Sequence, residues 1–255
     1  MNITMPMSLA ASYKSPPQKA RVVTEGWAST NLFCPACSAN RISPSPSNTR
    51  AVDFSCDSCG ATFQLKEKSS AFTNRVIDGA YHALIAALQS DLAPNLLLLQ
   101  YDRATWTVTN LLLVPNFAFP ASAIECRKPL SATARRAGWI GCFIVLSRIP
   151  LDARIFVVHD GVPIATETVR THYRRLLPLK QIAVPERGWT LDVLNTARNL
   201  GQREFTNADM YSQSEELQAL HPENRHVTDK IRQQLQFLRD SGFLKHVGRG
   251  RWQFT

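Results

Sequence analysis

The chain has 255 residues, of which 44% are hydrophobic and 19% are charged. This composition excludes a disordered chain and a fibrous repeat, and the length suits one large domain with a smaller one. The longest apolar stretches, such as Leu96–Leu99, are far shorter than the roughly 20 residues that span a bilayer, so no membrane partner is expected. Because the N-terminal residues lack the apolar run of a signal peptide, we expect a cytoplasmic protein with reduced cysteines.

Basic side chains outnumber acidic ones by 29 to 20, which gives a net charge of +9 and favours a polyanionic partner. The excess is uneven along the chain. Residues 181–220 contain 3 basic and 6 acidic side chains, whereas residues 221–255 contain 7 basic and 3 acidic ones. This alternation indicates a small C-terminal module with one charged face.

The first 180 residues contain a loop-rich segment, 1–60, followed by alternating strands and helix. Apolar residues recur at helical spacing over Asn74–Gln89, which predicts a helix there. Short apolar runs predict strands over Phe63–Lys66, Leu96–Tyr101, Trp106–Val114 and Arg154–Val158. Strands beside a helix of this length indicate an α/β or α+β core, with a mixed sheet flanked by helices.

The pattern changes after Pro185 to three helices and a hairpin. Thr190 is placed to cap the first helix, and Thr206 with Asp209 opens the second. The predicted elements are helices over Leu191–Leu200, from Thr206 and from about Arg225 to Ser241, then strands over Phe243–Val247 and Trp252–Phe254. This is the order of a winged helix-turn-helix. We therefore expect two domains, 1–182 and 183–255.

Four of the six cysteines form two C-x2-C pairs with 18 residues between the pairs, a spacing typical of zinc knuckles. Four thiolates suit tetrahedral Zn²⁺ and leave no open position for chemistry, so we expect a structural zinc. The predicted ligands within this knuckle, 34–59, are Cys34, Cys37, Cys56 and Cys59. Cys126 and Cys142 have no partner at such a spacing and are expected to be core thiols.

A candidate catalytic site surrounds the second pair. Asp53 precedes it, and Gln64 and Lys66 lie on one face of the strand that follows it. An Asp on one strand and an E/D/Q-x-K on the next are the layout of PD-(D/E)xK nucleases. Asp53, Gln64 and the carbonyl of Leu65 would hold Mg²⁺, and Lys66 would lower the pKa of the attacking water. The alternative is a solvated strand edge.

Segments along essentially the whole chain, in the same order, resemble the DpnI-type methyl-directed restriction endonucleases. They are Lys14-Ser15, Gln18-Lys19-Ala20-Arg21, Thr24-Glu25, the two cysteine pairs, Ala51–Phe54, Phe63–Lys66, Asp78-Gly79-Ala80-Tyr81, Thr133–Cys142, Arg187-Gly188-Trp189-Thr190, Lys230–Gln236, Leu238-Arg239-Asp240 and Gly248-Arg249-Gly250.

The resemblance implies a PD-(D/E)xK domain with a zinc knuckle, followed by a winged helix. It implies a Mg²⁺-dependent type II endonuclease that breaks both strands of double-stranded DNA at G-A-T-C sites carrying N6-methyladenine, with no small-molecule substrate. The family has Glu where this chain has Gln64, and a lost negative charge weakens Mg²⁺ binding. The alternative function is a zinc-containing winged-helix DNA-binding protein, a regulator or a methyl reader with a decayed nuclease site.

The third C-terminal helix is the expected DNA reader. Ile231, Leu235 and Leu238 recur at the spacing of a core-facing side. Gln pairs with adenine edges and Arg with guanine in the major groove, whereas arginines on the wing contact phosphates or the minor groove. The predicted DNA-binding residues of this module are His226, Lys230, Arg232, Gln233, Gln236, Arg249 and Arg251. For any one of them, the alternative is a solvated side chain.

In the first domain, Arg135 and Arg136 lie beside Trp139. Arginines can hold the DNA backbone while an indole contacts the methyl group of a modified adenine. The alternative for Trp139 is a core position, which is also the interpretation of Trp27 and Trp189.

Overall fold

The computed structural model describes residues 1–46, 49 and 51–255. The chain forms two compact units, each assembled from separate segments. The first contains Met1–Thr73, Ala93–Asn116 and Asp152–Leu176; the second contains Asn74–Leu92, Phe117–Leu151 and Leu177–Thr255. The predicted division at residues 182 and 183 remains a prediction. No helix in the described part of the chain is long and apolar enough to cross a membrane.

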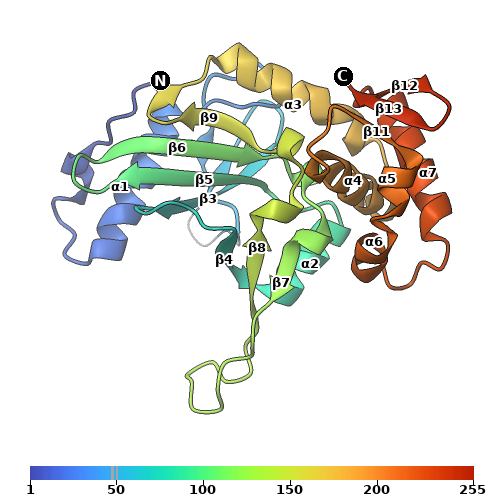
Figure 1. Ribbon diagram of the computed structural model, residues 1–255. Helices are drawn as coiled ribbons and strands as arrows, with labels where there is room; N and C mark the ends of the chain where they lie inside the picture. The colour runs from blue at the N-terminus through green and yellow to red at the C-terminus, as the bar shows by residue number, and fades with distance from the viewer. Residues whose placement is uncertain (47–48, 50) are drawn as a thin grey trace. The chain divides into compact units, whose positions relative to one another are not determined.

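The first unit contains a seven-stranded mixed sheet in the order β1-β2-β3-β5-β6-β9-β10 (Figure 1). Its strands are β1 (Ser43–Pro44), β2 (Phe54–Ser55), β3 (Thr62–Lys68), β5 (Asn95–Asp102), β6 (Thr107–Val114), β9 (Ile155–His159) and β10 (Val162–Pro163). β3 and β5 pair in parallel, and the other pairs are antiparallel. The run Leu96–Leu99 is buried along its length, as expected for a central strand covered on both faces. The four strands predicted from apolar runs are confirmed.

Two helices of this unit, α1 (Pro16–Asn31) and α3 (Thr166–Lys180), were not predicted. The Pro16-Pro17 pair lies in the first turn of α1, where proline is tolerated because the early N–H groups have no helical partner. The indole of Trp27 is fully buried and donates to the carbonyl of Asn2 at 2.7 Å. The helix is thus anchored by packing, as predicted for Trp27.

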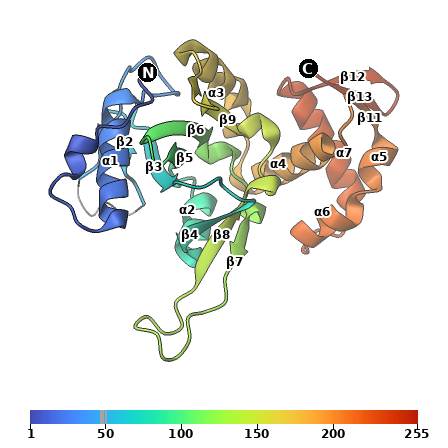
Figure 2. The same ribbon diagram turned by 60° about the vertical axis from the view of Figure 1, so that its left-hand side comes forward.

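The second unit contains a three-stranded sheet in the order β4-β8-β7, with strands β4 (Arg75–Ala80), β7 (Ile124–Cys126) and β8 (Gly141–Val145). The helix predicted over Asn74–Gln89 is wrong in its first half, because only α2 (Tyr81–Gln89) is helical. Val76 and Asp78 are buried between exposed neighbours, and this alternation suits a strand. The loop between β7 and β8 extends away from its sheet in both views (Figures 1 and 2).

The rest of the second unit is the predicted winged helix. Its elements are α4 (Val184–Asn199), β11 (Glu204–Thr206), α5 (Asn207–Tyr211), α6 (Ser214–Leu220), α7 (Val227–Asp240), β12 (Leu244–Gly248) and β13 (Arg251–Phe254). Thr206 and Asp209 form the expected capping box, and Gly242, at φ +80°, follows the end of α7. The predicted cap at Thr190 is wrong: α4 begins earlier, with Pro185 in its first turn, and Thr190 is buried within it.

The predicted fold class is confirmed: a mixed α/β core carries a four-cysteine cluster and is followed by a helix-turn-helix domain. Cys142 and Trp189 are buried as predicted. Cys126, predicted to be a core thiol, is exposed because it lies at the end of the short strand β7, where the chain leaves the sheet.

Candidate functional site

The four paired cysteines converge on one point. The Sγ atoms of Cys34, Cys37, Cys56 and Cys59 all lie within 4.8 Å of one another. Two of the separations, Cys34 to Cys59 and Cys37 to Cys56, are 3.6 Å. Zn–S bonds of about 2.3 Å in a tetrahedron place sulfurs about 3.8 Å apart, whereas a disulfide would bring them to about 2.05 Å. The cluster therefore has the size and donor set of a tetrahedral metal site.

The backbone around the thiols favours their ionised form. The N–H of Ala39 donates to Sγ of Cys37 at 3.5 Å. Burial has the largest effect on Cys56 and raises its pKa, but hydrogen bonds from the backbone of Cys59 and Ser58 and from the side chains of Cys37 and Cys34 together lower that pKa to about 7. At Cys34 and Cys59 burial prevails over the backbone hydrogen bonds and raises the pKa. Because a metal binds the thiolate, these N–H groups prepare the cluster for a cation.

The predicted catalytic residues are also brought together, beside this cluster. The N–H of Asp53 donates to the carbonyl of Phe63 at 2.8 Å, and the N–H of Leu65 donates to Oδ2 of Asp53 at 2.7 Å. Phe63 and Leu65 are buried, whereas Gln64 and Lys66 are half-buried on the opposite face of β3. The Asp53 carboxylate is thus fixed to the backbone between the two side chains that the sequence pairs with it.

A further carboxylate, Glu67, lies within electrostatic range of both Asp53 and Glu25. Burial raises the pKa of Glu67, and the negative charges of Glu25 and Asp53 raise it further. Glu25, on α1, is ion-paired with Arg21 at 2.7 Å. The sequence motif did not include Glu25 or Glu67. Glu67 could have been included from the sequence, because it follows Gln64-Leu65-Lys66 directly.

The predicted reading helix has the expected orientation. Ile231, Leu235 and Leu238 are fully buried. The predicted DNA-binding residues of this module that are exposed are His226, Arg232, Gln233, Gln236, Arg249 and Arg251. An open groove of about 610 Å³ at the N-terminal end of α7 is lined by residues that include His226, Asp229 and Gln233. In helix-turn-helix proteins this end of the reading helix meets the base edges.

Lys230 differs from the other predicted DNA contacts of this module because it is half-buried and closely ion-paired. Its Nζ lies 2.5 and 2.6 Å from the two carboxylate oxygens of Glu186 on α4. Gln234, fully buried one turn further, donates to Glu186 at 3.0 Å and accepts from the hydroxyl of Thr190 at 2.6 Å. This network joins the reading helix to α4, so Lys230 positions the helix whatever it does toward DNA.

The hairpin residues Arg135 and Arg136 are exposed, and Trp139 is half-buried. The guanidinium of Arg136 lies 4.8 Å from the Trp139 ring centroid. A Cβ at Gly141 would fall 2.9 Å from that ring, so the indole packs closely on the backbone there. Trp139 thus combines a packed face with partial exposure.

We expect Glu186→Gln to lower the free energy of unfolding by about 1–2 kcal/mol, because Lys230 would lose its ionic partner in a half-buried position. The measurement is urea denaturation followed by circular dichroism. Asp240→Asn is the matched control, since the Arg239–Asp240 pair on the same helix is exposed on both sides and should change the free energy by less than about 0.5 kcal/mol. Equal effects of the two substitutions would contradict the positioning role.

Comparison with known protein families assigns both parts of the chain. Residues 1–182 match the family model DpnI, described as the Dam-replacing family. Residues 185–254 match DpnI_C, described as the Dam-replacing HTH domain. The chain therefore belongs to the DpnI, or Dam-replacing, family of restriction endonucleases and carries its DNA-binding helix-turn-helix domain.

Proposed function

We propose that the protein is a Mg²⁺-dependent type II endonuclease that makes double-strand breaks at GATC-like sites containing N6-methyladenine. The observation that carries this proposal is the Leu65 N–H···Asp53 hydrogen bond of 2.7 Å. It holds a carboxylate against the backbone of β3 between Gln64 and Lys66, which supports a shared role for the acid, the amide and the amine.

The residues can form a magnesium site, although the ligand set has one negative charge fewer because Gln64 is neutral. Mg²⁺ prefers oxygen ligands, and Asp53, Gln64 and the carbonyl of Leu65 would supply them. When bound, the ion would polarise the scissile phosphate and make a bound water more acidic. The amine of Lys66 would hold the attacking water and stabilise charge that develops on the phosphate. Glu25 and Glu67 add negative potential that partly offsets the neutral Gln64.

We further propose that the ion in the cysteine cluster is a structural Zn²⁺. Four sulfur ligands complete a tetrahedral shell, so no position is left for a substrate. Its second pair, Cys56 and Cys59, lies in the connection between β2 and β3, and Asp53, Gln64 and Lys66 lie on or beside these two strands. Zinc would thereby fix the spacing of the catalytic groups.

DNA would be held and read by the second unit. His226, Arg232, Gln233 and Gln236 would contact base edges in the major groove, and Arg249 and Arg251 would contact the backbone. Arg135 and Arg136 would bind phosphates near the methyl group, with Trp139 against the methyl itself. Each methyl contact contributes about 1–3 kcal/mol, so contacts in two places would multiply the discrimination.

The test is digestion of one plasmid, prepared with and without adenine methylation, in Mg²⁺ or in EDTA, with the fragment ends sequenced. We expect cuts in the methylated plasmid with Mg²⁺ only.

Lys66→Met should lower the cleavage rate by about 100-fold or more, because it removes the group that activates water. Lys68→Met, on the same strand but exposed, should cleave like the wild type. An intact methylated plasmid in Mg²⁺ would refute the hydrolytic function.

Gln64→Glu is expected to lower the Mg²⁺ concentration needed for half-maximal cleavage, because it restores a negative charge to the metal cage. The measurement is a magnesium titration of the cleavage rate, with Gln89→Glu at the exposed end of α2 as a control for added charge. Loss of cleavage in Gln64→Glu would show that Gln64 is not a metal ligand.

Gln64 also favours one other function, a DNA-binding methyl reader with a decayed nuclease site. In that case the wild type would bind methylated duplex without cutting it at any Mg²⁺ concentration. The plasmid digest and a binding assay on the same DNA separate the two functions.

Trp139→Ala should reduce the preference for methylated over unmethylated duplex by about 10-fold, the range of one methyl contact. Binding constants for both duplexes measure this. Arg135→Ala, which removes an exposed cation from the same hairpin, should weaken both duplexes equally. If Trp139→Ala also weakens both equally, the indole has a packing role.

A further inference from the structure

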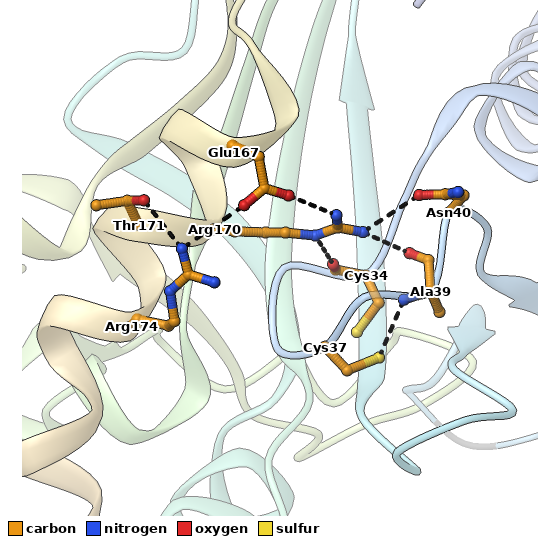
Figure 3. Close-up of polar contacts among 8 residues, drawn as sticks. All are labelled: Cys34, Cys37, Ala39, Asn40, Glu167, Arg170, Thr171 and Arg174. Atoms are coloured by element: carbon orange, nitrogen blue, oxygen red, sulfur yellow. Dashed lines mark hydrogen bonds and ion pairs between the residues drawn. The ribbon is translucent and has the colours of Figure 1, made fainter.

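A buried arginine lies against the cysteine cluster (Figure 3). Arg170, on α3, has only 9% of its side chain exposed. Its Nε donates to the carbonyl of Cys34 at 3.2 Å, and its Nη2 donates to the carbonyl of Ala39 at 2.9 Å. Nη2 also lies 3.5 Å from Oδ1 of Asn40, and Nη1 lies 2.8 Å from Glu167.

These contacts close the loop that carries the first cysteine pair. The N–H of Cys34 donates to the carbonyl of Ala39 at 3.0 Å, so the loop 34–39 is already joined across its base. Arg170 bonds to a carbonyl at each end of this loop. The planar guanidinium suits such a task, because its donors point in fixed, diverging directions. A lysine cannot reproduce this geometry.

The hydrogen bonds engage all three nitrogens of Arg170, and its guanidinium lies 5.5 Å from the ring centroid of Phe33, but none of these contacts supplies a buried negative charge. A buried cation is costly unless a negative charge lies nearby. Glu167 is a weak partner because 69% of its side chain is exposed, and water screens an exposed pair. Zn²⁺ with four thiolates carries a net charge of −2. The metal centre is therefore the buried negative charge that this position can serve.

We propose that Arg170 is a positioning residue of the metal centre: it holds the loop of the first cysteine pair and offsets the negative charge of the zinc–thiolate group. The inference depends on the proposed structural zinc. Outer contacts of this kind change metal affinity by about 10- to 100-fold when they are removed.

The experiment measures zinc on the purified full-length chain. Metal content is determined by mass spectrometry, and affinity by competition with a chromogenic chelator. The cobalt-substituted chain adds a spectroscopic reading of the thiolate–metal geometry. We expect Arg170→Met to bind zinc about 10-fold or more weakly than the wild type and to alter the cobalt spectrum. Arg174→Met is the matched control, since Arg174 lies one turn further, contacts Glu167 and Thr171, and is 55% exposed (Figure 3).

Two more variants separate the parts of the proposal. Arg170→Lys keeps the positive charge without the planar guanidinium, so it should bind zinc more tightly than Arg170→Met. An equal loss of zinc affinity in the two variants would overturn the charge-balancing role. Glu167→Gln should leave zinc affinity near that of the wild type, and a loss as large as that of Arg170→Met would make Glu167 the main counter-charge. If Arg170→Met does not fold, Arg170→Lys is compared with the wild type instead.

Unchanged zinc affinity in both Arg170 variants would overturn the inference while leaving the zinc proposal intact. A wild-type chain that binds no zinc would instead refute the structural zinc itself. The two failures are therefore distinguishable in the same series of measurements.

Discussion

The position of Asp53 depends on very little regular structure. β2, which follows it, is two residues long, and so short a strand has little stability of its own. Asp53 is joined to β3 by two hydrogen bonds, one donated by its backbone N–H to Phe63 and one accepted by its carboxylate from Leu65, and the second cysteine pair starts directly after β2. A metal ion at that cluster would replace the pairing energy that a longer strand would supply. The candidate catalytic centre would thus depend on a metal-filled cluster that it does not contain.

Features encoded in short stretches of sequence could be predicted. The apolar runs gave the strands of the large sheet, the cysteine spacing gave the cluster, and Thr206 with Asp209 gave a helix start. Each depends on residues a few positions apart. The winged helix could be predicted for the same reason, because its helices, their stop signals and its hairpin follow one another directly.

Features that depend on partners far away in the chain could not be predicted from the sequence. Arg75–Ala80 is a strand because β8, more than sixty residues later, pairs with it; the local spacing alone suits a helix. Lys230 was expected to be a free cation, but Glu186 lies 44 residues earlier in the chain. Arg170 had no sequence signal at all, since its partners Cys34 and Ala39 are more than 130 residues away. α1 lies within the segment 1–60, which is expected to be loop-rich, and its anchor, the contact of Trp27 with Asn2, joins residues that are 25 positions apart in the chain.

The hairpin beyond β7 and β8 is an arm with few ties to any core. Its inner part is joined across by backbone hydrogen bonds such as Leu130 N–H to Trp139 O at 2.9 Å, while Arg135 and Arg136 near its tip are exposed. Substitutions at exposed positions usually change stability very little. The exposed positions of this arm can therefore accumulate substitutions at little cost to folding, so its surface is free to diverge while the strands that carry it stay the same.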